Sequence, residues 1–353
     1  MVVEKFIWDM TYACPLRCAH CYSESGRRPA GNRDDDVLRI AQFVAAHRPK
    51  RVSLSGGEPL IVKGWAEAAR RMRDAGVEVT LFTSGWTLDE ADAERLAQSV
   101  TSVCVSIDGG TEQTHDALRG RSGSFRSAMV ALEILDAFKR SRDGRCYTLG
   151  ADYTVVRSNF DEMRRFVEDV TARFPALDYL RFAMAMPCGL AAEEAFAARE
   201  ILTDEQSRTL RASGPMLQGW ARGGAKVSIT DTRSFLLHTV HCAAPPSVGH
   251  IEPDGRMRAF PIYEAKVGSV LEEPLEELWP RMIAWQNDPF VVEQLRSIET
   301  NEDWARAART LDRRFGAESD KARIALRIRG PREHRGDDAG LGHMGLRPVE
   351  GAR

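Results

Sequence analysis

Short apolar runs alternate with longer amphipathic stretches over the first two thirds of the chain. The apolar runs predict strands at 5–11, 51–55, 77–82, 101–107, 147–156 and 178–184. The amphipathic stretches predict helices at 34–47, 63–75, 88–98, 123–140, 160–173 and 203–221. In the fourth helix, a stripe at helical spacing is expected to face the core: Phe125, Met129, Leu132 and Leu135. Six strand–helix units in succession predict an α/β fold with a parallel sheet inside a layer of helices.

Composition narrows the class of protein. The 353 residues are 43% hydrophobic, which is enough for one large domain and a smaller one. The net charge is −2 with both signs intermixed, so nothing indicates a nucleic-acid partner. The chain shows no apolar run of membrane-spanning length and no signal-peptide pattern. Seven cysteines, an odd and partly clustered set, indicate reduced thiols and metal ligands, so we expect a cytoplasmic protein without a membrane partner.

Three of these cysteines form the most specific chemical feature. Cys14, Cys18 and Cys21 follow the first predicted strand with C-x3-C-x2-C spacing. Three thiolates on one loop can hold three irons of a four-iron, four-sulfur (4Fe-4S) cluster, leaving one iron open because such clusters usually take four ligands. A zinc site that adds His20 and a chance grouping of thiols are the alternatives. Zinc is disfavoured because His20 adjoins Cys21 and no second C-x2-C pair exists.

The loop after the second strand carries a second feature. In Ser55-Gly56-Gly57-Glu58-Pro59, the two glycines let the backbone approach a ligand closely, and Glu58 can accept hydrogen bonds from an ammonium group. With the cysteine loop, this stretch resembles the radical S-adenosylmethionine (radical SAM) superfamily. The resemblance implies that Cys14, Cys18 and Cys21 hold one 4Fe-4S cluster, whose open iron binds S-adenosylmethionine. It also implies that Gly56, Gly57 and Glu58 hold the amino group of that cofactor.

Two further loops extend the resemblance. After the third strand, Ser84 stands where the family has an amide; an ordinary turn is the alternative reading. After the fourth strand, Ser106, Asp108 and Arg119 resemble the Ser-Ile-Asp-Gly … Arg stretch of the SPASM/twitch branch, with one extra residue before Arg119. The resemblance implies that Ser106 and Arg119 contact the ribose and the carboxylate of the cofactor. The two parallel N–H groups of an arginine side chain suit a carboxylate because they can bond both of its oxygens. Asp108 has the alternative role of capping the following turn.

Cys188 ends the sixth unit, in Met186-Pro187-Cys188-Gly189. Its thiol is a candidate donor of a hydrogen atom to a substrate radical if it faces the barrel mouth; a small buried residue is the alternative. Cys104 lies between two valines within a strand and is expected in the core.

Beyond residue 225 the organisation changes. A Pro-Asp-Gly turn at 253–255 predicts a hairpin, and the stretch around it resembles a SPASM domain. In the family a cysteine follows this hairpin and helps to bind auxiliary clusters. Here Phe260 takes that position and no cysteine follows Cys242, so we expect the fold without auxiliary clusters and Phe260 packed in their place. His238, His241 and His250 are expected to be ordinary polar residues.

The resemblance implies a partial (β/α)6 TIM-like barrel followed by a small SPASM/twitch-like α+β module. We predict the core barrel over 1–222, a degenerate SPASM/twitch-like domain over 223–285, a helical segment over 286–329 and a disordered tail over 330–353.

The implied activity is reductive cleavage of S-adenosylmethionine to a 5′-deoxyadenosyl radical, which abstracts a substrate hydrogen. A flavodoxin- or ferredoxin-type protein would supply the electron. The substrate is a peptide, with a separate recognition protein as a possible partner, or a small molecule such as a sugar, nucleoside or tetrapyrrole. Loss of auxiliary clusters favours redox-neutral outcomes such as epimerisation, rearrangement or elimination. A zinc-stabilised, non-catalytic binding module is the remaining alternative.

Overall fold

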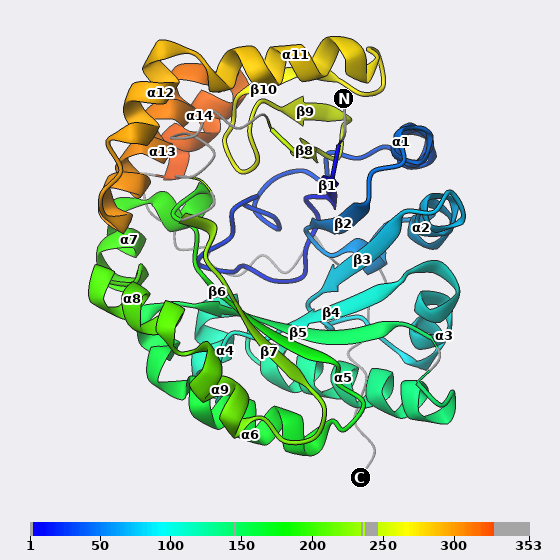
Figure 1. Ribbon diagram of the computed structural model, residues 1–353. Helices are drawn as coiled ribbons and strands as arrows, with labels where there is room; N and C mark the ends of the chain where they lie inside the picture. Colours follow the sequence, from blue (N-terminus) through cyan, green and yellow to red (C-terminus); the bar gives the residue numbers. More distant parts are fainter. Residues whose placement is uncertain (1–2, 145, 234–235, 237–245, 328–353) are drawn as a thin grey trace, which may run out of the picture.

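A single curved sheet of ten strands organises the computed structural model, which describes residues 3–144, 146–233, 236 and 246–327 (Figure 1). The strand order is β10-β9-β8-β1-β2-β3-β4-β5-β6-β7. Strands β1 to β7 pair in parallel along this order. They are β1 Lys5–Thr11, β2 Arg51–Gly56, β3 Glu78–Thr83, β4 Ser102–Ser106, β5 Thr148–Val155, β6 Tyr179–Met184 and β7 Lys226–Thr230. The six predicted strands are therefore confirmed, and β7 adds a seventh that the sequence pattern did not reveal.

Helices cover the outside of the curve, as Figure 1 shows. They are α1 Asp34–His47, α2 Trp65–Asp74, α3 Glu90–Ser99, α4 Glu112–Arg119, α5 Ser124–Ser141, α6 Met163–Arg173, α7 Glu194–Glu200, α8 Asp204–Ala212 and α9 Gly214–Trp220. The predicted helix 203–221 is two helices, because Gly214 and Pro215 start a new one. Pro lacks the N–H that a continuing helix needs. The short helices α4 and α7 were not predicted.

The two faces of the barrel sheet differ in polarity. On β1, Phe6, Trp8 and Met10 are fully buried against the outer helices. Asp9, which points to the opposite face, pairs in register with Ser55 of β2. A parallel sheet that is covered on both faces is usually apolar on both faces. The polar residues on the inner face therefore indicate a binding or catalytic site inside the barrel.

The C-terminal segment continues the same sheet. Strand β8 (Val248–Ile251) pairs in parallel with β1, and β9 (Arg256–Arg258) and β10 (Lys266–Ser269) follow antiparallel. The hairpin predicted at 253–255 is confirmed, with Gly255 at φ +81°. Four helices follow: α11 Leu275–Gln286, α12 Pro289–Arg296, α13 Asn301–Phe315 and α14 Glu318–Arg327. The proposed domain boundaries at 222 and 285 stay predictions; His238, His241, Cys242 and segment 330–353 lie outside the described residues.

Phe260 lies within an aromatic cluster, and its packing in the place of an auxiliary cluster stays a prediction. It is 7% exposed, and its ring centroid lies 5.9 Å from that of Tyr263 and 6.2 Å from that of Trp285. The Tyr263 hydroxyl accepts a hydrogen bond from Trp304 Nε1 at 3.2 Å. Such rings bury much apolar area, so they hold the C-terminal helices against the hairpin.

A buried network of charges joins α14 to the cysteine loop. Arg327 forms ion pairs with Glu24 and Glu264 and donates to the Gly189 carbonyl at 3.3 Å. Arg323 forms ion pairs with the same two carboxylates. Glu24 lies three residues after Cys21 and is only 5% exposed, so the last described helix braces the cysteine loop.

No helix in the described ranges is long and apolar enough to cross a membrane.

Candidate cofactor site

The cysteine loop lies where β1 ends, in the middle of the curved sheet (Figure 1). One cavity of about 240 Å³ is lined by the three cysteines and by most of the other predicted site residues: Gly56, Gly57, Ser84, Ser106 and Arg119. These residues come from the loops after β1, β2 and β3, from the last residues of β2 and β4 and from α4. The carboxyl ends of parallel strands meet at one edge of a sheet, which is why segments far apart in sequence converge here.

The Cys14 and Cys18 thiols are protonated at neutral pH when no metal binds them. Burial raises the pKa of Cys14 well above its usual range. Burial also raises the pKa of Cys18, to about 11, although the Arg119 charge opposes this. Metal binding must therefore displace protons, as thiolate ligation requires. Within the described residues, no three His, Cys, Asp or Glu side chains converge on the position of a single metal ion.

Cationic side chains and backbone donors surround the loop. The Arg27 guanidinium donates to the Cys18 carbonyl at 3.1 Å, and Arg17 donates to the Cys14 carbonyl at 2.9 Å. Arg119 Nη1 lies 3.9 Å from Cys18 Sγ, and the Ser25 N–H donates to Cys21 Sγ at 3.3 Å. Donors and positive charges of this kind stabilise an anionic thiolate–iron centre.

The glycine pair packs directly on the cysteine loop. A Cβ at Gly57 would lie 2.0 Å from the Ala13 carbonyl oxygen, and the Gly57 N–H donates to Thr11 O at 2.7 Å. Gly56 has φ +98°, a conformation that favours glycine. A side chain at Gly57 would therefore displace the segment that leads into Cys14 before it reached a bound cofactor.

Glu58 is fully buried and does not line the cavity. Its carboxylate accepts hydrogen bonds from Thr83 Oγ1 at 2.9 Å, from the Ser84 N–H at 2.9 Å and from Ser84 Oγ at 2.5 Å. The Leu60 N–H donates to it at 3.3 Å. Burial raises the pKa of Glu58. In this structure Glu58 ties the loop after β2 to the loop after β3, and the backbone of the glycine pair is what faces the cavity.

Asp108 holds Arg119 in place. Its Oδ2 lies 2.6 Å from Arg119 Nε and 2.7 Å from His20 Nε2. The Thr154 N–H donates to Oδ1 at 2.9 Å. Burial opposes the charge on Asp108, but Arg119 and His20 outweigh it and hold the pKa of Asp108 well below its usual range. Asp108 is fully buried and does not line the cavity, so it positions the Arg119 fork.

Cys188 does not line this cavity. It is fully buried, and its thiol donates to the Met186 carbonyl at 3.6 Å. The expected exposure of this thiol to the barrel mouth is not observed, because the loop after β6 folds back on the C-terminal helices. Its role as a hydrogen donor stays a prediction. Cys104 is fully buried, as expected.

Sequence reasoning missed a buried triad. The Tyr22 hydroxyl donates to Asp9 Oδ1 at 2.6 Å and lies 3.1 Å from Ser55 Oγ. His250 Nε2 lies 3.0 Å from Asp9 Oδ2, and His250 Nδ1 accepts from the Ile262 N–H at 3.3 Å. His250, expected to be an ordinary polar residue, thus links the C-terminal hairpin to the cavity wall. Asp9 inside an apolar strand was the available signal.

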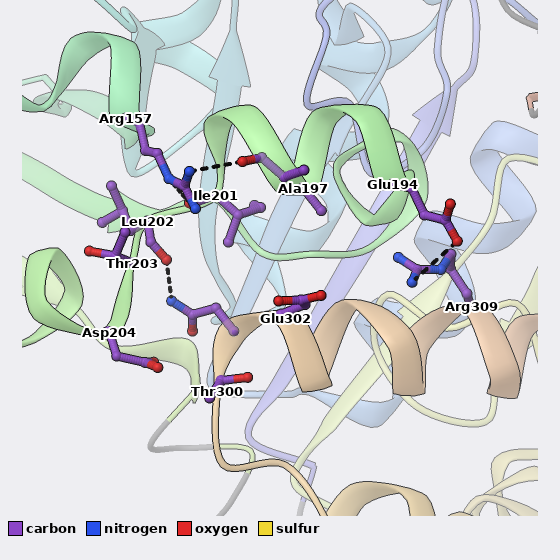
Figure 2. Close-up of a pocket in the computed structure, with 12 residues that line it drawn as sticks. Arg157, Glu194, Ala197, Ile201, Leu202, Thr203, Asp204, Thr300, Glu302 and Arg309 are labelled. Atoms are coloured by element: carbon purple, nitrogen blue, oxygen red, sulfur yellow. Dashed lines mark hydrogen bonds and ion pairs between the residues drawn. The ribbon is translucent and has the colours of Figure 1, made fainter.

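A second hollow, of about 570 Å³, lies between α7, α8 and the start of α13 (Figure 2). Arg157 spans its rim and donates to the Ile201 carbonyl at 2.6 Å and to the Ala198 carbonyl at 2.8 Å. On the opposite side Arg309 pairs with Glu194. None of the cysteines and none of the glycine-motif residues line this hollow, so the chemistry belongs to the first cavity.

Comparisons with known proteins agree with this geometry. Residues 8–168 match the model of the radical SAM superfamily. The AdoMet-dependent heme synthase of Methanosarcina barkeri is 26% identical over 77% of this chain and 80% of its own length. The sporulation killing factor maturation protein SkfB of Bacillus subtilis is 27% identical over 76% of this chain and 63% of its own. SuiB of Streptococcus suis, solved with its precursor peptide SuiA, shares the fold with a TM-score of 0.58 at 13% identity, over 84% of this chain and 67% of that one.

A curved parallel sheet with a three-cysteine loop at its carboxyl edge, matched by this family, defines an enzyme that uses a 4Fe-4S cluster and S-adenosylmethionine. Residues 8–168 form a domain of the radical SAM superfamily.

Proposed function

We propose that this radical SAM enzyme modifies a ribosomally made peptide, with Cys14, Cys18 and Cys21 as the ligands of its one cluster. One observation carries the site: the three cysteines and the glycine pair line a single cavity at the carboxyl edge of the barrel. This is the edge on which barrels of this kind place their chemistry.

The chain's own residues prepare that cavity. The three thiols supply ligands, and Arg119, Arg27 and Arg17 place positive charge or donors on the loop that carries them. With a 4Fe-4S cluster held by Cys14, Cys18 and Cys21 and S-adenosylmethionine beside it, the site would supply a radical able to take a hydrogen atom from the substrate. The protein orients both partners and excludes water and other hydrogen donors.

We assign the remaining cofactor contacts to groups that line the cavity. The backbone of Gly56 and Gly57 binds the amino group of the cofactor. Ser84, whose hydroxyl is hydrogen-bonded to Glu58, lines the same part of the cavity and contacts the cofactor there. Ser106 receives the ribose, and the Arg119 fork receives the carboxylate, with Asp108 fixing its orientation. A guanidinium already paired on one edge loses less side-chain freedom when it binds a carboxylate.

Relatives support a peptide as the substrate. SkfB is a maturation protein for the sporulation killing factor, and SuiB has been solved with its precursor peptide SuiA. A small-molecule substrate is the second candidate. A heme synthase matches this chain over 80% of its own length, which favours a tetrapyrrole within that class. We also propose a flavodoxin- or ferredoxin-type electron donor and, for a peptide, a separate recognition protein.

The substrate test uses anaerobic holoenzyme, S-adenosylmethionine and dithionite. Precursor peptides encoded beside the gene form one arm, and iron coproporphyrin forms the other. We expect a peptide to increase 5′-deoxyadenosine formation over the substrate-free reaction and to change in mass. If iron coproporphyrin does so and no peptide does, the peptide proposal is wrong and the tetrapyrrole takes its place.

A further inference from the structure

A row of polar residues crosses the inner face of the barrel below the cofactor cavity. Ser106, Asp152, Arg181 and Ser228 pair in register across β4, β5, β6 and β7. Residues paired in register point to the same face of a sheet, and Ser106 and Asp152 line the cavity. The row therefore faces the lumen.

Arg181 and Asp152 form an ion pair within this row. Arg181 Nε lies 2.7 Å from Asp152 Oδ1, and the two side chains are 30% and 21% exposed. The Arg181 guanidinium also lies over the Phe82 ring, 5.1 Å from its centroid. Both of its neighbours line the cavity, and so does Ala183, which follows Arg181 on the same face of β6. Arg181 thus lies directly under the cavity floor.

The contacts of Arg181 leave its fork available. Nε is paired, whereas the two terminal nitrogens have no hydrogen-bond partner among the residues that the structure describes. A guanidinium fixed at Nε and stacked on an aromatic ring presents its terminal N–H groups in a defined plane, which matches the two oxygens of a carboxylate. Arg119, which does line the cavity, pairs with Asp108 near Cys18 and is assigned above to the carboxylate of the cofactor, so it is not the group left for the substrate.

A second cation lies close to this pair. Lys5, at the start of β1, has its pKa lowered to about 8 by burial and by the charges of Arg181 and Arg51, while Asp152 opposes this effect. Lys5 stands four residues before Asp9 on β1, so it lies on the same inner face of the sheet as Asp9 and the polar row. Two cations face one carboxylate, so this part of the lumen attracts an anion.

We propose that Arg181, oriented by Asp152 and supported by Lys5, binds a carboxylate group of the substrate at the floor of the lumen. The binding group is an acidic side chain or the C-terminus of a peptide, or an acidic side chain of a tetrapyrrole. This inference rests on the proposed function only in placing the substrate inside the lumen. It does not depend on which of the two substrate classes is correct.

The test measures equilibrium binding to cofactor-loaded, unreduced holoenzyme, so it needs no turnover. Each probe is an acid paired with a neutral partner. N-acetyl-Ala-Glu-Ala amide is compared with its Gln analogue, N-acetyl-trialanine with its amide, and coproporphyrin III with its tetramethyl ester. We expect at least one acid to bind about tenfold more tightly than its neutral partner. The pair that shows the difference identifies the source of the carboxylate.

Two variants locate the effect. Arg181→Gln should bring the acid-to-neutral affinity ratio close to one, whereas Arg126→Gln on the outer surface of α5, where the side chain is 76% exposed, should leave it unchanged. Lys5→Gln provides a second change on another strand and should lower the ratio partly. Equal affinities within every pair for the wild-type enzyme, or no measurable binding of any acid, would overturn the inference. So would an unchanged ratio in folded Arg181→Gln. Cleavage of S-adenosylmethionine by the wild-type enzyme is measured separately and tests the proposed function alone.

Discussion

At the scale of single residues, Arg119 carries most of the electrostatics of the site. It is buried between the Asp108 carboxylate and the Cys18 sulfur, and Asp108 raises its pKa although burial opposes this. An arginine in this position stays charged at any pH at which the protein is folded. Its fork can therefore serve both a cofactor carboxylate and the thiolate beside it.

Replacing Arg119 with Gln should weaken S-adenosylmethionine binding by about 1.5–3 kcal/mol, because a charged hydrogen-bond partner is lost. Calorimetric titration of the cluster-loaded protein measures this. The matched control is again Arg126→Gln on the outer surface of α5, which should bind as the wild type does. Unchanged affinity in the Arg119 variant would show that the extra residue in the loop after β4 shifts the family's arginine to another position.

Gly57→Ala should damage the cysteine loop as well as cofactor binding. The added Cβ would meet the Ala13 backbone, which cannot rotate away, and we expect a loss of about 1–3 kcal/mol in stability together with reduced iron content. Gly219→Ala in α9 is the control, since no atom lies within 4 Å of its added Cβ. Iron analysis and thermal unfolding of both variants decide the point. A stable Gly57→Ala protein with full iron would contradict the packing described above.

His115 should make the protein sensitive to acid. Burial, reinforced by the Arg119 charge, lowers the pKa of His115 to about 4, whereas an unfolded histidine titrates near 6.5. As the pH falls from about 7 to 5, the unfolded chain takes up a proton that the folded chain does not, so folding loses about 1–2 kcal/mol. His115→Gln, which keeps an acceptor for the Asp108 N–H, should lose less stability over this range in denaturant unfolding. Equal losses in the two proteins would argue against a neutral buried His115.

At the scale of secondary-structure elements, the sequence predicted what local patterns control. The strands β1 to β6 and the longer helices were found because their apolar spacing is regular, as in α5, where Ala128, Met129, Leu132 and Leu135 are buried. β7 escaped notice because it is only five residues long, Lys226–Thr230, and follows two glycines that indicate a loop. Helices α4 and α7 are too short for their period to be visible.

The site was predictable only where a motif or an unusual residue marked it. Cys14 and Gly57 were found from motifs. The sequence did not show that Glu58 and Asp108 bind neighbouring protein groups and do not line the cavity. Whether a carboxylate faces a cavity or another loop depends on packing between strands that lie far apart in the sequence. The Asp152–Arg181 pair was overlooked because polar residues within two apolar strands acquire meaning only when their register is known.

Helix α14 gives a prediction at this scale. Arg327→Gln removes one partner of a buried pair and leaves Glu24 and Glu264 with less compensation, which should cost about 3 kcal/mol and loosen the cysteine loop. Arg306→Gln on α13 is a suitable control, because the side chain of that arginine is 63% exposed and, among the residues that the structure describes, its ion pair is with Asp303, one turn away. Thermal unfolding and the retention of iron during gel filtration measure the difference. A variant at Arg327 that matches the control would show that α14 does not brace the loop.

At the scale of the whole molecule, the hairpin of the C-terminal module continues the barrel sheet through β8, and aromatic rings and buried ion pairs attach its helices. Phe260 stands where the resemblance places a cluster-binding cysteine. The described cysteines outside the cysteine loop, Cys104, Cys146 and Cys188, are free, and no three metal-ligating side chains of the described residues come together around a metal position. We therefore expect one cluster, with about four irons per chain after full reconstitution. About eight irons, or a paramagnetic cluster surviving in the Cys14/Cys18/Cys21→Ala triple variant, would show that an auxiliary cluster exists.

The central claim is that the cysteine loop, together with the cavity beside it, cleaves S-adenosylmethionine by one-electron chemistry. The most direct measurement is 5′-deoxyadenosine formation by anaerobic, reconstituted protein after reduction with dithionite, compared with each single Cys→Ala variant at Cys14, Cys18 and Cys21. The account predicts a brown wild-type protein that forms 5′-deoxyadenosine, and three variants that lose both cluster and product. A colourless zinc-containing wild type, or undiminished cleavage in any of the three variants, would contradict it.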